Sequence, residues 1–179
     1  MNKRQWGLLV MVGLMAGALG IGLSSFNYRT TAANDQVVEA FFKEELKSPT
    51  GAIHNTEEWR NKILVLNYWA SWCPPCVEEM PTLAMMSQSY KDKNVLFVGI
   101  GVDSPSNIRE FLSKTPVNYP VTVNPINGVN WAENMGNPSG GLPFTVLIDE
   151  KGVIKKTKLG KITEDELKSW LDSAILSSK

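Results

Sequence analysis

Short, unbroken apolar runs in the middle of the chain predict buried strands. Residues 63–69 and 95–102 are two such runs, and continuous hydrophobicity is typical of strands that helices cover on both faces. Between them, residues 75–90 carry apolar side chains at helical spacing, and Pro81 is placed to kink the predicted helix. A strand, a helix and a second strand in this order predict a parallel pair of strands.

The flanking segments carry weaker patterns that predict further strands and helices. Residues 37–46 and 52–54 are strand candidates around the turn sequence Ser-Pro-Thr-Gly, so they predict an N-terminal hairpin. After the second buried strand the pattern predicts a helix over 104–114, a strand over 120–123, one or two helical turns around 129–135, and a hairpin of strands over 144–148 and 153–158.

The last predicted helix has a clear start and a clear buried face. Thr163 and Glu166 have the spacing of a capping box, in which two side chains satisfy free backbone N–H groups at a helix start. The apolar residues that follow at helical spacing are Leu167, Trp170, Leu171, Ala174 and Ile175.

The amino terminus has the pattern of a membrane anchor. Residues 6–26 carry no charge and follow Lys3 and Arg4. These 21 residues would span roughly 31 Å as a helix, which matches a bilayer core of about 30 Å. The basic pair predicts a cytoplasmic amino terminus and places the remaining chain outside the cytoplasm. A cleaved signal peptide ending at the small residues 31–33 is the alternative, but an apolar stretch longer than ~7–15 residues favours an uncleaved anchor.

These observations divide the chain into an anchor over 1–26, a polar tether over 27–36 and one domain over 37–179. About 150 residues are enough for a single domain with its own core. Since Lys3 and Arg4 belong to the anchor, 16 of the 18 basic residues remain against 18 acidic ones. No excess of positive charge exists to attract nucleic acid, so we expect that the protein does not bind it. We also expect a monomer.

Sulfur chemistry is confined to one place, because Cys73 and Cys76 are the only two cysteines. They lie where a predicted strand passes into a predicted helix. Unpaired N–H groups and the positive end of the dipole at a helix start stabilise a thiolate, so Cys73 is the candidate nucleophile. Cys76 lies one turn further, more buried, and is the candidate resolving thiol. Pro74 and Pro75 suit a first helical turn and stiffen the loop.

Structural roles for the cysteine pair are weaker alternatives. A structural zinc site needs four ligands, and the chain offers two thiols and one histidine, His54. A disulfide that closes so small a loop adds little stability, because the entropy of loop closure grows with loop length. Three nearby methionines suggest soft-metal binding, although their helical spacing favours a role in the core. These methionines are Met80, Met85 and Met86.

The motifs around the cysteines resemble one family in particular. The string WASWCPPC over residues 69–76, Pro81 and the segment Gly-Leu-Pro-Phe-Thr over 141–145 are similar to the thioredoxin superfamily. The stretch 73–81 resembles its membrane-anchored TlpA/ResA/CcmG group of extracytoplasmic thiol-disulfide reductases. The resemblance implies a thioredoxin-like α/β fold with a central mixed sheet flanked by helices. It also implies a cis Leu142–Pro143 bond that packs against the dithiol, with the substrate strand beside Leu142. The supporting residues of such a site are Trp72, Pro74, Pro75, Leu142 and Pro143.

The resemblance also implies a role for Glu79. Thioredoxins carry a buried aspartate six residues before the first cysteine, where this chain has Asn67. Glu79, three residues after Cys76, matches the acid that the TlpA/ResA/CcmG group places beside its dithiol. A carboxylate there can accept the proton of Cys76, directly or through water. The alternative is an acid that merely stabilises the helix start, and this is our interpretation of Glu78.

We therefore expect an extracytoplasmic enzyme that reduces disulfides in other proteins through Cys73 and Cys76. The chain has no flavin or nicotinamide motif and needs no cofactor beyond its own disulfide. The resemblance implies a membrane electron donor of the DsbD/CcdA type, and apocytochrome c or copper-delivery proteins of the respiratory oxidase as substrates. Two alternatives stay open: a DsbA-like oxidant, since direction depends on the reduction potential, and a copper-binding chaperone.

Overall fold

The computed structural model describes residues 35–177, which fold around one seven-stranded sheet. The described part begins with a helix over 35–41. The elements that follow are β1 (Glu45–Lys47), β2 (Ile53–Asn55), the 3₁₀ helix η1 (Thr56–Trp59), β3 (Ile63–Trp69), α2 (Pro74–Tyr90), β4 (Val95–Gly101), α3 (Pro105–Lys114), β5 (Val121–Val123), α4 (Asn127–Asn134), β6 (Phe144–Ile148), β7 (Ile154–Leu159) and α5 (Glu164–Ser177).

The sheet is mixed, with the strand order β2-β1-β5-β4-β3-β6-β7. β3, β4 and β5 run parallel, as the predicted strand, helix and strand required. Beyond β3, β6 runs antiparallel to it, and the edge strand β7 runs antiparallel to β6. β3 therefore lies near the middle of the sheet, and Cys73 lies four residues after its last residue, Trp69.

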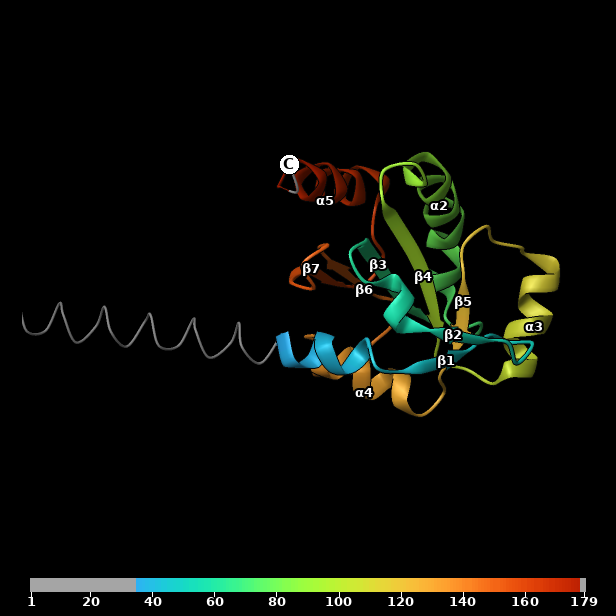
Figure 1. Ribbon diagram of the computed structural model, residues 1–179. Helices are drawn as coiled ribbons and strands as arrows, with labels where there is room; N and C mark the ends of the chain where they lie inside the picture. Colours follow the sequence, from blue (N-terminus) through green and yellow to red (C-terminus); the bar gives the residue numbers. More distant parts are fainter. Residues whose placement is uncertain (1–34, 178–179) are drawn as a thin grey trace, which may run out of the picture. The chain divides into compact units, whose positions relative to one another are not determined.

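Helices cover both faces of this sheet, which confirms the expected α/β architecture. Figure 1 shows α2 and α5 on one side, and α4 with the N-terminal helix on the other. Two hydrophobic clusters fill the spaces between the layers: one includes Met80 and Leu167 from α2 and α5, and the other includes Phe41 and Ala132. Every residue of β3 is buried, as its continuous apolar run predicts.

The prediction of a strand over 37–46 is wrong for most of that range. The structure has a helix over 35–41, and only Glu45–Lys47 is a strand, paired with β2 in the expected hairpin. Val38, Phe41 and Phe42 are all buried, and this spacing puts them on one helical face. The ring of Phe41 lies against Trp131 of α4, so a distant element supplies the partner that favours the helix.

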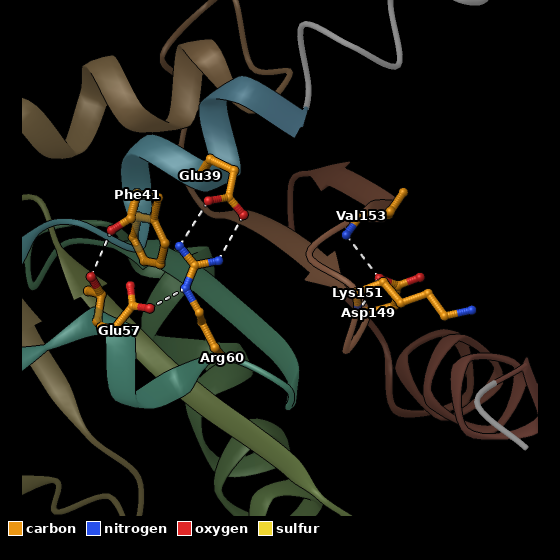
Figure 2. Close-up of polar contacts among 8 residues, drawn as sticks. Glu39, Phe41, Glu57, Arg60, Asp149, Lys151 and Val153 are labelled. Atoms are coloured by element: carbon orange, nitrogen blue, oxygen red, sulfur yellow. Dashed lines mark hydrogen bonds and ion pairs between the residues drawn. The ribbon is translucent and has the colours of Figure 1, made fainter.

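Polar contacts tie this N-terminal helix to η1 (Figure 2). The Arg60 guanidinium donates to both carboxylate oxygens of Glu39, at 2.8 and 2.9 Å, and its Nε donates to Glu57. The Thr56 hydroxyl donates to the backbone oxygen of Phe41 at 2.8 Å. The junction that the sequence pattern missed is thus fixed by side chains from the following turn.

The other predicted elements are found with small changes of boundary. Ser104 caps α3 by accepting from the backbone N–H of Asn107. Thr163 accepts from the backbone N–H of Glu166 at the start of α5, while the Glu166 side chain pairs with Lys158 of β7. Asp149 accepts from two backbone N–H groups of the β6–β7 turn, also drawn in Figure 2.

The predicted anchor over 1–26 and most of the tether lie outside the described residues. Within 35–177, no helix has the length and hydropathy needed to cross a bilayer.

Candidate active site

The two cysteines lie at the junction of β3 and α2 and form a disulfide. Their Cα atoms are 5.3 Å apart, and Cys73 is 4% exposed while Cys76 is fully buried. This order of burial agrees with the predicted roles, because an attacking thiol has to meet another protein and a resolving thiol does not. The roles themselves stay predictions.

The start of α2 favours negative charge at Cys73. Cys73 is the N-cap residue, its side chain makes no capping hydrogen bond, and Pro74 and Pro75 occupy the first helical positions. The backbone N–H groups of Cys76 and Val77 both donate to the carbonyl of Cys73, at 3.0 and 3.1 Å. The positive end of the helix dipole therefore faces Cys73 and stabilises a thiolate there after reduction.

The loop before β6 has the conformation that the resemblance implies. The Leu142–Pro143 bond is cis. Leu142 is partly buried and packs against the cluster that contains both cysteines. The Pro143 carbonyl accepts from the N–H of Gly160 at 2.8 Å, and the Asn137 side-chain amide donates to the carbonyl of Gly141. Hydrogen bonds on both sides therefore fix this loop next to β7.

Exposed residues surround the dithiol on the outside. Trp72, immediately before Cys73, is 66% exposed and is available to contact another protein. Glu78 is exposed and pairs with Lys161 at 2.9 Å, in agreement with its interpretation as an ordinary helix-start acid. Trp72 thus adds one exposed apolar side chain beside the buried dithiol.

Glu79 lies on the inner side of α2, one helical turn after Cys76, and it is fully buried. One carboxylate oxygen accepts from the side-chain amide of Asn67 at 2.7 Å, and the other accepts from the backbone N–H of Ile162 at 2.8 Å. The same Asn67 amide donates to the Thr145 hydroxyl at 3.1 Å. Asn67, Glu79 and Thr145 thus form one hydrogen-bonded group.

Burial raises the pKa of Glu79 above its ordinary value. The hydrogen bonds from Ile162 and Asn67, and then the positive charges of Lys161 and Lys158, oppose this rise in the pKa but do not cancel it. A carboxyl group with a raised pKa exchanges its proton closer to neutral pH, where thiols also act as acids. Such a group is suited to accept a proton from a neighbouring thiol.

Several residues of this site carry no local sequence signal. The β3–β6 register places Thr145 directly opposite Asn67, so only the strand pairing identifies Thr145. Asp103, buried after β4, accepts from the backbone N–H and the hydroxyl of Ser71 in the turn before the dithiol. The Asn107 side-chain amide and the N–H of Ser104 donate to the other Asp103 oxygen. Burial alone would raise the pKa of Asp103, but these hydrogen bonds together outweigh it and lower the pKa. Asp103 therefore fixes the approach to Cys73.

The structure changes the interpretation of the methionines. Met80 and Met86 are buried core residues, as their spacing predicts, but Met85 is 45% exposed, so its assignment to the core is wrong. Among residues 35–177, no group of three or more histidine, cysteine, aspartate or glutamate side chains is arranged to hold a metal ion.

The fold and the cysteine pair together define a class, the thioredoxin-like thiol-disulfide oxidoreductases. More narrowly, the chain belongs to the Redoxin family, whose model matches residues 32–174.

Individual relatives agree with this assignment. The chain is 29% identical to a thiol-disulfide oxidoreductase ResA of Geobacillus thermodenitrificans, with 92% of each chain covered. It is 30% identical to the thioredoxin-like protein YneN of Bacillus subtilis, over 71% of this chain and 74% of the relative. Among solved structures, a thioredoxin-related protein from Neisseria meningitidis serogroup B has 33% identity and a TM-score of 0.66, over 75% of this chain and 100% of the other.

Proposed function

We propose that this protein reduces disulfides in other proteins outside the cytoplasmic membrane. The observation that carries the proposal is the buried Glu79 one turn after Cys76, held by Asn67 and by the backbone of Ile162. An attacking thiolate needs only the helix start, whereas the release of a substrate needs a second thiol that can lose its proton. Glu79 supplies an acceptor for that proton.

The reaction follows from these positions. In the reduced protein, the Cys73 thiolate attacks one sulfur of the substrate disulfide, and the other substrate sulfur leaves and takes a proton from water. The Cys76 thiol then transfers its proton to Glu79 and attacks Sγ of Cys73. The Cys73–substrate bond breaks, and the released sulfur is protonated. Two electrons have passed to the substrate, and the protein retains the Cys73–Cys76 disulfide that the structure holds.

The setting of this reaction is part of the proposal. The charge pattern before residue 27 supports an anchor with the enzyme domain on the outer side. A membrane electron donor of the DsbD/CcdA type returns the dithiol to its reduced state. Apocytochrome c cysteines are the first candidate substrate, and oxidised copper-delivery proteins are the second. The similarity to ResA, named as a thiol-disulfide oxidoreductase, supports the type of reaction.

Trapping the intermediate is the direct test. In the full chain, Cys76→Ser leaves Cys73 free to attack but removes the thiol that releases the substrate. We expect mixed disulfides with extracytoplasmic proteins, seen as reducible high-mass bands and identified by mass spectrometry. The matched control is the double variant that also carries Cys73→Ser, which should trap nothing. Absence of any Cys73-linked partner in the single variant would refute the enzymatic role.

A second measurement tests the direction of exchange. Equilibration with glutathione gives the reduction potential, and a reductase is expected below about −200 mV. A reduction potential of about −120 mV, as in a strong oxidant, would instead indicate a DsbA-like oxidant. Tight, stoichiometric Cu(I) binding that is lost when the exposed Met85 is replaced would instead indicate that the protein is a copper-binding chaperone.

A further inference from the structure

A buried asparagine holds the loop that leads from α4 to β6. Asn137 is 2% exposed, and its side-chain amide donates to the carbonyl of Gly141 at 2.8 Å. Its side-chain oxygen accepts from the hydroxyl of Ser139 at 3.0 Å. A buried amide is costly unless its polar atoms are paired, and Asn137 makes both of these bonds within its own loop. The side chain therefore acts on the loop and not on the core.

The backbone already closes this loop without the side chain. Two residues after α4, Gly136 has a φ of +109°, and the N–H of Asn137 donates to the carbonyl of Ala132 at 3.0 Å. The carbonyl of Asn137 then accepts from the N–H of Gly140 at 2.9 Å. These bonds attach Asn137 to the end of α4. The side-chain bond to Gly141 comes in addition, and its specific effect is to set the direction of that one carbonyl.

The bond to Gly141 also sets the direction of the next backbone N–H. The peptide between Gly141 and Leu142 is planar and trans, so its C=O and its N–H point in opposite directions. Because the carbonyl faces the buried Asn137, the N–H of Leu142 points away from Asn137. Within residues 35–177, neither the N–H nor the carbonyl of Leu142 has a hydrogen-bond partner. Leu142 thus offers unpaired backbone groups, while its side chain packs on both hydrophobic clusters.

Leu142 lies alongside the turn that leads to Cys73. β3 and β6 are paired as far as Tyr68 and Phe144, and two more residues along each segment bring Leu142 level with Ala70. The N–H of Cys73 donates to the carbonyl of Ala70 at 3.2 Å. A substrate whose sulfur reaches Cys73 therefore passes beside Leu142, and an extended peptide there can accept a hydrogen bond from the Leu142 N–H.

We propose that Asn137 is a positioning residue for the attack on disulfides in peptides: by holding the Gly141 carbonyl, it directs the Leu142 N–H towards the backbone of the substrate. The inference rests on the reductase function proposed above and adds the need for a peptide backbone next to the reacting sulfur. The reaction is unchanged, since the Cys73–Cys76 dithiol becomes a disulfide and passes two electrons to the substrate disulfide, which becomes two thiols. A small disulfide without a backbone gains nothing from Leu142.

The test compares Asn137→Ala with the native protein in a single turnover, with the full chain reduced beforehand. Two substrates are used: a synthetic peptide with one disulfide, and bis(2-hydroxyethyl) disulfide, which has no peptide bond. We expect the second-order rate constant for the peptide to fall about two- to tenfold, as for the loss of one neutral hydrogen bond, and that for the small disulfide to stay unchanged. Damage to the dithiol would slow both reactions equally, so the readout is the ratio of the two rate constants.

Ser139→Ala is the matched control. It removes the hydroxyl that donates to Asn137 but leaves the bond to Gly141, so the ratio should stay at its native value. A native ratio in folded Asn137→Ala overturns the inference and leaves the reductase function intact. If the native protein reacts with neither disulfide, the reductase function itself fails, and this inference fails with it.

A second measurement decides if Asn137→Ala does not fold. In Cys76→Ser, the mixed disulfide of Cys73 with the peptide is compared by NMR with the one formed by 2-mercaptoethanol. We expect the Leu142 amide proton to exchange with solvent about two- to tenfold more slowly in the peptide adduct, because only there is it hydrogen-bonded to substrate. Equal exchange in the two adducts overturns the inference.

Discussion

The two faces of the sheet are lined by alternate residues of the same strand, β3, but they differ in chemistry. Leu64, Leu66 and Tyr68 face α4 and pack in a cluster of apolar side chains. Asn67 faces α2, where it holds the buried Glu79. One face thus gains stability from apolar contact, while the other gives up part of that stability to keep a titratable group beside a dithiol.

The largest expected effect comes from removing the charge on the α2 face. Glu79→Gln keeps the size of the side chain but cannot take a proton from Cys76. Loss of a general base lowers a reaction rate by about 10²- to 10⁴-fold. The rate of substrate release should therefore fall by that factor, while the rate of attack by Cys73 stays unchanged. Stopped-flow measurement of the two steps separates them. If the native protein and Glu79→Gln release substrate at the same rate and with the same pH profile, Glu79 does not accept the proton of Cys76.

Leu66→Ala tests the opposite face. Leu66 is fully buried among apolar neighbours, so the substitution should lower the free energy of unfolding by about 2–5 kcal/mol. The pH dependence of thiol exchange should not change, because no titratable group is touched. Urea unfolding gives the first quantity and alkylation of Cys73 across pH the second. A shifted alkylation profile would show that the two faces are coupled.

The stability of the protein should depend on pH through Glu79. Its pKa is raised in the folded state, so folded protein keeps the proton at pH values where unfolded protein has lost it. Stability should therefore fall as pH rises from about 4.5 through the folded pKa, and then level off. Asp103 acts with the opposite sign and at lower pH, because its pKa is lowered below 3.8. The urea midpoints of the native protein and of Glu79→Gln should converge at acid pH. Parallel curves of midpoint against pH would show that Glu79 does not cause this dependence.

The smallest expected effect compares one hydroxyl on each face. Thr145→Val removes an acceptor of Asn67 and should cost about 0.5–1.5 kcal/mol. Tyr68→Phe removes a hydroxyl that donates to the sulfur of Met135 at 3.4 Å, a weak acceptor, and should cost less. Thr145→Val should also alter substrate release, whereas Tyr68→Phe should not. Equal behaviour of the two variants would mean that Thr145 has no part in positioning Glu79.

The sequence predicts the centre of the fold better than its start. The apolar runs at 63–69 and 95–102 correspond to β3 and, with one residue to spare, to all of β4, because strands buried on both faces need little outside information. Residues 37–41, which the local pattern predicts as strand, instead belong to the helix over 35–41. Its buried residues depend on partners such as Trp59 and Trp131, which are far away in sequence. Tertiary contact overrides a short local pattern there.

The same distinction holds for the site. Cys73, Cys76 and the cis bond before Pro143 follow from local motifs and a family resemblance. The contacts that hold them do not, because each joins segments far apart in the chain. The Ser71 hydroxyl donates a hydrogen bond to Asp103, and the Asn67 amide donates one to Thr145. The sequence therefore indicates the reactive groups but few of the residues that position them.

The bond from the Ile162 backbone to Glu79 has a consequence for biosynthesis. It joins residues 83 positions apart and lies just before the last helix. A chain emerging from the ribosome exposes both cysteines long before residue 162 is made. The carboxylate gains its second support only when the carboxyl-terminal segment docks, so a nascent chain carries thiols that can attack without the complete means of release. We expect full turnover to begin only after synthesis is nearly complete.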